Sequence, residues 1–84
     1  MACRVVVLRR AVDDFASLPT EMRIRVGEAL QQLESFPSDR GIKKMRPPFE
    51  GFRKRVGDFR ILFDVTRNTI LVRRIKNRRD AYRA

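Results

Sequence analysis

The spacing of apolar residues changes near residue 50 and divides the chain into two kinds of structure. Before that point, a β-branched run at 3–8 predicts a buried strand. Apolar residues at steps of three or four then predict two helices, one over 10–18 and one of about sixteen residues that begins at Thr20. A proline follows each helix. The first half therefore predicts a strand followed by a helical hairpin.

The second half follows a period of two, which is typical of strands. Apolar and polar residues alternate over 52–56, 59–65 and 69–75, whereas the stretch 37–50 is rich in proline, glycine and charge. We interpret 37–50 as a loop and the three alternating segments as an antiparallel meander. Helices packed on one face of that meander give an α+β fold.

A two-residue turn sets the register of the first hairpin. Gly57-Asp58 suits a tight turn with glycine at its first central position, which places Arg55 opposite Arg60. Arg53 falls on the same face because side chains alternate along a strand. Lys54 falls on the apolar face, and we expect it to reach the sheet edge. The face that should meet the helices carries Phe52, Val56, Phe59, Ile61, Phe63 and Val65.

Positive charge is concentrated in the second half of the chain. The 84 residues fit a single domain, 1–84, with a net charge of +10. Residues 1–42 hold six basic and six acidic groups, whereas 43–84 hold fourteen basic and four acidic groups. Sixteen of the twenty basic residues are arginine, whose planar fork matches phosphate. A solvated basic sheet face is one interpretation, but two arginines facing each other favour a site that holds a polyanion, such as the backbone of RNA.

Several other chemistries are excluded by residue type. Cys3 is the only cysteine and there is no histidine, so a usual zinc site, an intrachain disulfide and a histidine-based triad are ruled out. The four glycines stand apart, so there is no glycine-rich phosphate loop. The apolar run Val5–Leu8 is too short to span a membrane. We expect a cytoplasmic protein without cofactor or membrane contact, and we interpret Asp13-Asp14 as a solvated helix face.

The C-terminal segment adds charge and the only tyrosine. Tyr82 could stack on a base or act in proton transfer. It could equally anchor the C-terminal segment on the sheet.

Over essentially its full length the chain resembles the RelE/ParE toxin superfamily of bacterial toxin–antitoxin modules. The specific motifs are FRKRVGDFRILFDV and RIKNRRDAY, and the basic IKKM segment also fits. The resemblance implies a small toxin neutralised by a separate antitoxin, whose C-terminal segment wraps the fold. In the RelE branch the toxin enters the ribosome and cleaves mRNA. The ribose 2′-OH attacks the adjacent phosphate there, and no metal is needed.

The resemblance also implies roles for individual residues. Arg60 matches the arginine that contacts the scissile phosphate, and Arg53 and Arg55 match the basic positions of the preceding strand. Arg78 matches the residue proposed to assist the leaving group, and Tyr82 matches the tyrosine proposed as general base. The further residues predicted to bind RNA phosphates are Lys43, Lys44, Arg73 and Arg79.

Two other functions stay open at this point. The ParE branch inhibits DNA gyrase without chemistry of its own, and a non-catalytic RNA-binding module would also carry the basic face. Asn77 stands where many relatives have histidine, so this chain lacks that acid–base group. The set of Arg53, Arg55, Arg60, Arg78 and Tyr82 favours ribosome-dependent mRNA cleavage over gyrase inhibition, because the ParE branch does not need residues that cleave a phosphate.

Overall fold

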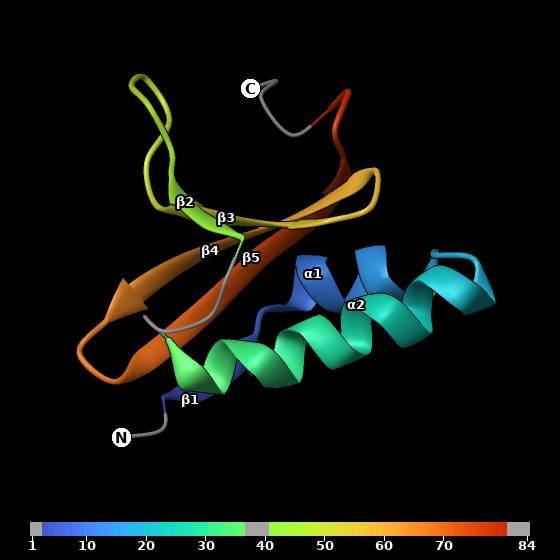
Figure 1. Ribbon diagram of the computed structural model, residues 1–84, viewed down its shortest axis with the longest axis horizontal. Coiled ribbons are helices and arrows are strands. Elements are labelled where there is room, and N and C mark those ends of the chain that lie inside the picture. Colours follow the sequence, from blue (N-terminus) through green and yellow to red (C-terminus); the bar gives the residue numbers. More distant parts are fainter. Residues whose placement is uncertain (1–2, 37–40, 81–84) are drawn as a thin grey trace.

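The computed structural model describes residues 3–36 and 41–80. Its strands form a five-stranded mixed sheet in the order β1-β5-β4-β3-β2, in which β1 runs parallel to β5 and the other neighbours are antiparallel. The two helices lie together on one side of this sheet (Figure 1). No helix within the described ranges is long and apolar enough to cross a membrane. The elements are β1 (Arg4–Val7), α1 (Arg9–Ala16), α2 (Thr20–Gln32), a 3-10 turn (Leu33–Ser35), β2 (Ile42–Lys44), β3 (Phe52–Val56), β4 (Phe59–Thr66) and β5 (Thr69–Asn77).

The predicted α+β class is confirmed, but the sheet is larger than the predicted meander. The interpretation of 37–50 as a loop was wrong at β2, which pairs with β3 and forms one edge. A three-residue strand with two lysines carries little apolar periodicity, and short charged strands are usual at sheet edges. The second helix is also shorter than predicted, because α2 passes into a 3-10 turn at Leu33.

The predicted register of the first hairpin is confirmed. Arg55 pairs with Arg60, and Lys54 pairs with Ile61 on the core face. Lys54 does not reach solvent as expected: it is only 5% exposed. The reason is β2, whose Ile42 pairs with Lys54 and covers the edge of β3.

A β-bulge in β5 changes the alternation of its side chains. Leu62 pairs with Arg74 and Phe63 pairs with Val72, so the intervening Arg73 has no direct partner on β4. The extra residue lets Val72 and Ile75, three positions apart, both be buried in the core. A strict period of two would have placed one of them on the opposite face.

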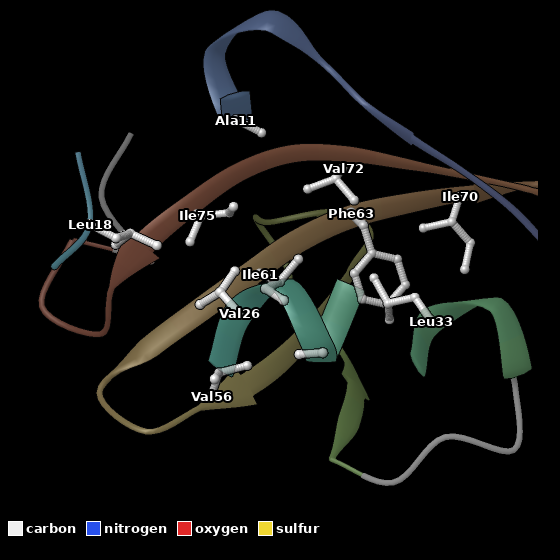
Figure 2. Close-up of a cluster of buried hydrophobic side chains, with 11 residues drawn as sticks. Ala11, Leu18, Val26, Leu33, Val56, Ile61, Phe63, Ile70, Val72 and Ile75 are labelled. Carbon is white, nitrogen blue, oxygen red and sulfur yellow. The ribbon is translucent and has the colours of Figure 1, made fainter. Parts of the chain in front are cut away.

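The hydrophobic core lies between the sheet and the helices. Phe63 is fully buried at its centre, and its ring packs against Phe52 in a stacked arrangement and against Phe36 edge-on. Figure 2 shows the core side chains of both helices and the central strands pointing toward one another. The face opposite the arginines is therefore fixed by packing, and the outer face of β3 and β4 is fixed with it. The fully buried larger side chains are Phe63, Leu33, Ile61, Ile70, Val26 and Val72.

The side chain of Asp14 binds the edge of β5 beyond the point where β1 ends. Its carboxylate accepts two hydrogen bonds from the Arg74 guanidinium, at 2.8 and 3.0 Å, and one from the backbone N–H of Ile75 at 2.9 Å. The interpretation of the Asp13-Asp14 pair as a solvated face is thus wrong for Asp14 and holds only for Asp13, whose side chain is 69% exposed. Burial raises the pKa of Asp14, but the bonds from Arg74 and Ile75 outweigh it and leave the pKa below its usual value.

Replacing Asp14 with asparagine should lower the free energy of unfolding at pH 7 by about 1.5–3 kcal/mol, the scale of a hydrogen bond to a charged group. Because the pKa of Asp14 is lower in the folded protein, its carboxylate stabilises the fold above pH ~4. That contribution is lost as pH falls through the lowered pKa, so the two proteins should converge in acid. Urea unfolding at several pH values measures this. Asp13→Asn is the matched control and should change stability by less than about 0.5 kcal/mol.

Candidate functional site

Four arginines converge where the β3–β4 hairpin meets the end of β5. Arg55 and Arg60 are paired across the hairpin, and Arg53 lies on the same face of β3. Arg78 follows β5 directly, and its N–H donates a 2.7 Å hydrogen bond to the carbonyl of Asp58 in the hairpin turn. The convergence of Arg53, Arg55 and Arg60, predicted from the turn, is confirmed. We call these three and Arg78 the arginine cluster.

The Arg60 guanidinium is held by the backbone of its own hairpin. Its Nη1 donates hydrogen bonds to the carbonyl oxygens of Gly57 at 3.1 Å and Phe59 at 2.9 Å. Gly57 has a positive φ of 58°, which glycine adopts without strain in a tight turn. The guanidinium is therefore oriented before any ligand arrives. Among the residues that the structure describes, no other group accepts a hydrogen bond from it, so its remaining N–H groups could bind an anion.

The electrostatics of the cluster favour a bound anion. Burial lowers the pKa of the Arg60 guanidinium below its usual value. The nearby charges of Arg55, Arg53 and Arg78, in that order, lower this pKa further, and the Asp58 carboxylate opposes them. Like charges held close together in a fixed frame repel one another, and a phosphate placed among them relieves the repulsion.

Sequence reasoning missed Lys76, which pairs with Arg60 across β4 and β5. It adds a fifth positive charge beside the cluster and also lines a hollow with Asp14 and Arg74. The register between β4 and β5 is the feature that would have identified Lys76 as a neighbour of Arg60. The bulge at Arg73 shifts that register by one residue, so simple counting from the turn would have placed Lys76 wrongly.

The other predicted residues are distributed more widely. Lys43 pairs with Arg53 and so adjoins the cluster, whereas Lys44 pairs with Phe52. Arg79 is exposed in the turn after β5. Tyr82 lies outside the described residues.

Arg73 lies outside the arginine cluster and contacts the loop between β2 and β3. Its Nε is 3.1 Å from a carboxylate oxygen of Asp64, and its Nη2 donates a 2.9 Å hydrogen bond to the carbonyl of Glu50. These contacts tie the loop between β2 and β3 to the face of β4 and β5. The phosphate-binding role predicted for Arg73 therefore competes with a structural one.

Gly51 lets that loop approach the sheet closely. Its φ is +91°, and a side-chain carbon there would lie 2.5 Å from Asp64 Oδ1 and 2.8 Å from the carbonyl oxygen of Phe63. The absence of a side chain at this position lets the chain just before β3 lie against Phe63 and Asp64 of β4.

Replacing Gly51 with alanine should therefore cost about 2–3 kcal/mol of stability, from backbone strain and from contact with a backbone oxygen. Gly41→Ala is the matched control, because Gly41 also has a positive φ, +83°, but has no atom within 4 Å of the added carbon. We expect only about 1 kcal/mol there. Equal losses in urea unfolding would show that the close approach at Gly51 contributes nothing.

Comparison with known proteins bears on the family of this chain. A model of the family described as the ParE toxin of the type II toxin–antitoxin system parDE matches residues 5–82. Comparison with curated protein sequences found no relative.

Three solved structures resemble the whole fold. The RelBE2 toxin–antitoxin complex of Mycobacterium tuberculosis matches with 25% identity and a TM-score of 0.81, over 92% of this chain and 99% of that one. The RelB–RelE complex of Methanococcus jannaschii matches with 26% identity and a TM-score of 0.75, over 93% and 95%. The RelE–RelB complex of Pyrococcus horikoshii matches with 26% identity and a TM-score of 0.75, over 100% of both chains.

Proposed function

The chain belongs to the RelE/ParE toxin superfamily of type II toxin–antitoxin systems, and we propose that it is a ribosome-dependent mRNA endonuclease of the RelE type. The observation that carries the proposal is the arginine cluster. Its four guanidinium groups gather at one end of the sheet, and Arg60 is oriented by backbone carbonyls. That arrangement suits a reaction in which negative charge grows on a phosphate.

The proposed reaction is attack of the ribose 2′-oxygen on the adjacent phosphorus. The 2′-OH loses its proton, a bond forms to phosphorus, and the bond to the 5′-oxygen of the next nucleotide breaks. Charge rises on the phosphate oxygens as this happens, and preformed cationic donors stabilise it without reorganising. We assign Arg60 to the scissile phosphate, with Arg53 and Arg55 beside it on β3.

Proton transfer needs groups on both sides of the phosphate. The leaving 5′-oxygen must gain a proton, and we assign that assistance to Arg78, which the Asp58 carbonyl holds beside the cluster. A guanidinium gives up its proton only reluctantly, so arginine is ordinarily a weak acid for this role. Tyr82 is the proposed base, and positive charges nearby would lower the pKa of a phenol.

The partners implied are a cognate antitoxin, mRNA and the ribosome. Three similar structures are toxin–antitoxin complexes, which supports an antitoxin partner for this chain. The ribosome would supply the substrate geometry, so cleavage of free RNA should be weak.

A translating extract tests the proposal directly. Adding the protein should cut mRNA at sites that depend on translation, and omitting ribosomes should abolish the cuts. Intact mRNA in the translating extract would contradict the proposed activity.

Inhibition of DNA gyrase is the second candidate, and the match to the ParE family model favours it. Under that function the basic face would serve binding alone. A DNA supercoiling assay separates the two, because inhibition of supercoiling without mRNA cleavage supports the gyrase function.

A further inference from the structure

Arg73 connects the sheet to the loop 45–51, which lies between β2 and β3. Its Nε is 3.1 Å from a carboxylate oxygen of Asp64 on β4, and its Nη2 donates a 2.9 Å hydrogen bond to the carbonyl of Glu50 in the loop. Figure 1 shows this loop in yellow-green, rising from the side of the sheet away from the helices. These contacts give Arg73 a role that the proposed cleavage step does not use.

The β-bulge in β5 places Arg73 for these contacts. Its neighbours Val72 and Arg74 pair with consecutive residues of β4, so no residue of β4 lies directly opposite Arg73. A bulge of this kind re-aims the side chain that it carries. Within the part of the chain that the structure describes, Arg73 Nε is shielded from solvent and has no aligned hydrogen-bond partner. Its attraction to the nearby Asp64 carboxylate is therefore mainly one of charge.

The loop meets the sheet at Gly51, beside the same ion pair. A side-chain carbon at Gly51 would lie 2.5 Å from Asp64 Oδ1 and 3.0 Å from Arg73 Nη2. Met45 N–H donates a 2.9 Å hydrogen bond to the Gly51 carbonyl, which closes the loop on itself. Met45 is only 7% exposed, although it is not part of the core between the sheet and the helices. Its burial therefore depends on the loop being held in this place.

The loop and β2 carry positive charges beside the arginine cluster. Lys43 pairs with Arg53 across β2 and β3, and Arg46 of the loop lines one hollow together with these two residues. β2 is only three residues long, so its pairing alone holds the loop weakly. The contacts of Arg73 supply a second point of attachment, and the positions of Lys43 and Arg46 relative to the cluster depend on it.

The same contacts oppose a direct phosphate-binding role for Arg73. An arginine binds an anion side-on through the edge formed by Nε and one Nη. In Arg73 that edge faces Asp64 and the Glu50 carbonyl. The Asp64 carboxylate also offsets the positive charge that would attract a phosphate.

We propose that Arg73 is a positioning residue, which together with Asp64 fastens the loop between β2 and β3. The fastened loop keeps Lys43 and Arg46 beside the arginine cluster, where they hold the RNA strand. Arg73 then acts on RNA through the loop and not by binding a phosphate itself. The proposal rests on the proposed endonuclease function for the identity of the polyanion, but the loop and the binding can be measured without cleavage.

Methyl NMR of the full chain reports the position of the loop. Asp64→Asn and Arg73→Gln each remove the ion pair, and both should shift the Met45 methyl signal while Met22, a core contact on α2, keeps its signal. Arg73→Lys keeps the charge but loses the planar fork that reaches Asp64 and the Glu50 carbonyl together, so it should shift Met45 as well. The two paired side chains are 38% and 39% exposed, so the fold should tolerate these changes. An unchanged Met45 signal in Asp64→Asn and Arg73→Gln would overturn the proposal.

RNA affinity separates positioning from direct phosphate binding by the sign of one change. The probe is a short single-stranded RNA with 2′-O-methyl groups, which cannot be cleaved by its own 2′-oxygen. Asp64→Asn removes a negative charge, so by charge alone it should bind this RNA more tightly. If Asp64 fastens the loop, the affinity should instead fall about tenfold, the scale of one lost hydrogen bond to a charged group.

Asp58→Asn is the matched control for this measurement. Asp58 lies in the hairpin turn, at the other end of β3 from the loop, and its carboxylate acts on Arg60. Removing this charge should tighten RNA binding about twofold, because the loop stays fastened. Tighter binding in Asp64→Asn, or equal weakening in both variants, would overturn the proposal.

A translating extract tests the positioning role in cleavage through KM and kcat. Asp64→Asn should raise KM about tenfold and change kcat by less than about twofold, since the loop holds the substrate and the transition state alike. A fall in kcat with an unchanged KM would overturn the proposal. If the Met45 signal and RNA affinity change as expected but the natural chain cuts no mRNA, the endonuclease function fails and the positioning role stands. If the natural chain cuts mRNA and Asp64→Asn changes neither Met45 nor RNA affinity, the positioning role fails and the endonuclease function stands.

Discussion

Replacing Arg60 with alanine should reduce mRNA cleavage in a translating extract about 100-fold or more and should release cells from growth arrest. The substitution removes a preoriented guanidinium that the backbone of Gly57 and Phe59 holds in place. Loss of one preformed donor to a developing oxyanion commonly costs a factor of about 100 to 1,000 in rate. Cleavage is measured by primer extension, and growth by inducing the variant.

Two controls make this result specific to the site. Arg10→Ala removes an exposed arginine on α1, on the side of the sheet away from the cluster, and should leave cleavage unchanged. Arg60→Lys keeps the charge but loses the planar fork, so it should recover only part of the rate. Full toxicity of Arg60→Ala would show that Arg60 is not at the reacting phosphate.

The core of the candidate site could be predicted because it depends on local geometry. A two-residue turn at Gly57-Asp58 fixes which residues of β3 and β4 face each other, so the pairing of Arg55 with Arg60 follows from counting. Arg78 needed the resemblance to a known family, because its approach depends on how β5 returns to the hairpin turn. Lys76 was missed, since the bulge in β5 changes the count.

The missed features of the fold depend on contacts between distant parts of the chain. β2 is too short and too charged to show a periodic pattern, and it forms because β3 offers an open edge. Asp14 contacts Arg74 and Ile75, which are sixty and sixty-one positions away in the sequence. Neither contact leaves a trace in the local pattern of apolar and polar residues.

The cluster depends on the core as well as on its own contacts. Its arginines repel one another, so the strands that carry them must be held together by packing on the opposite face. Phe63 is central to that packing, because it lies on β4 three residues after Arg60 and is fully buried. A chain of 84 residues has a thin core, and its total stability is expected to be roughly 4–13 kcal/mol.

Phe63→Ala should therefore cost about 3–5 kcal/mol and leave much of the protein unfolded at 37 °C. The substitution opens a cavity under β4 and removes the ring contacts with Phe36 and Phe52. Urea unfolding measures the loss. Phe59→Ala is the matched control on the same strand, because Phe59 is only partly buried, and it should cost clearly less. A loss below about 1 kcal/mol at Phe63 would mean that the sheet carrying the arginines does not rely on this core.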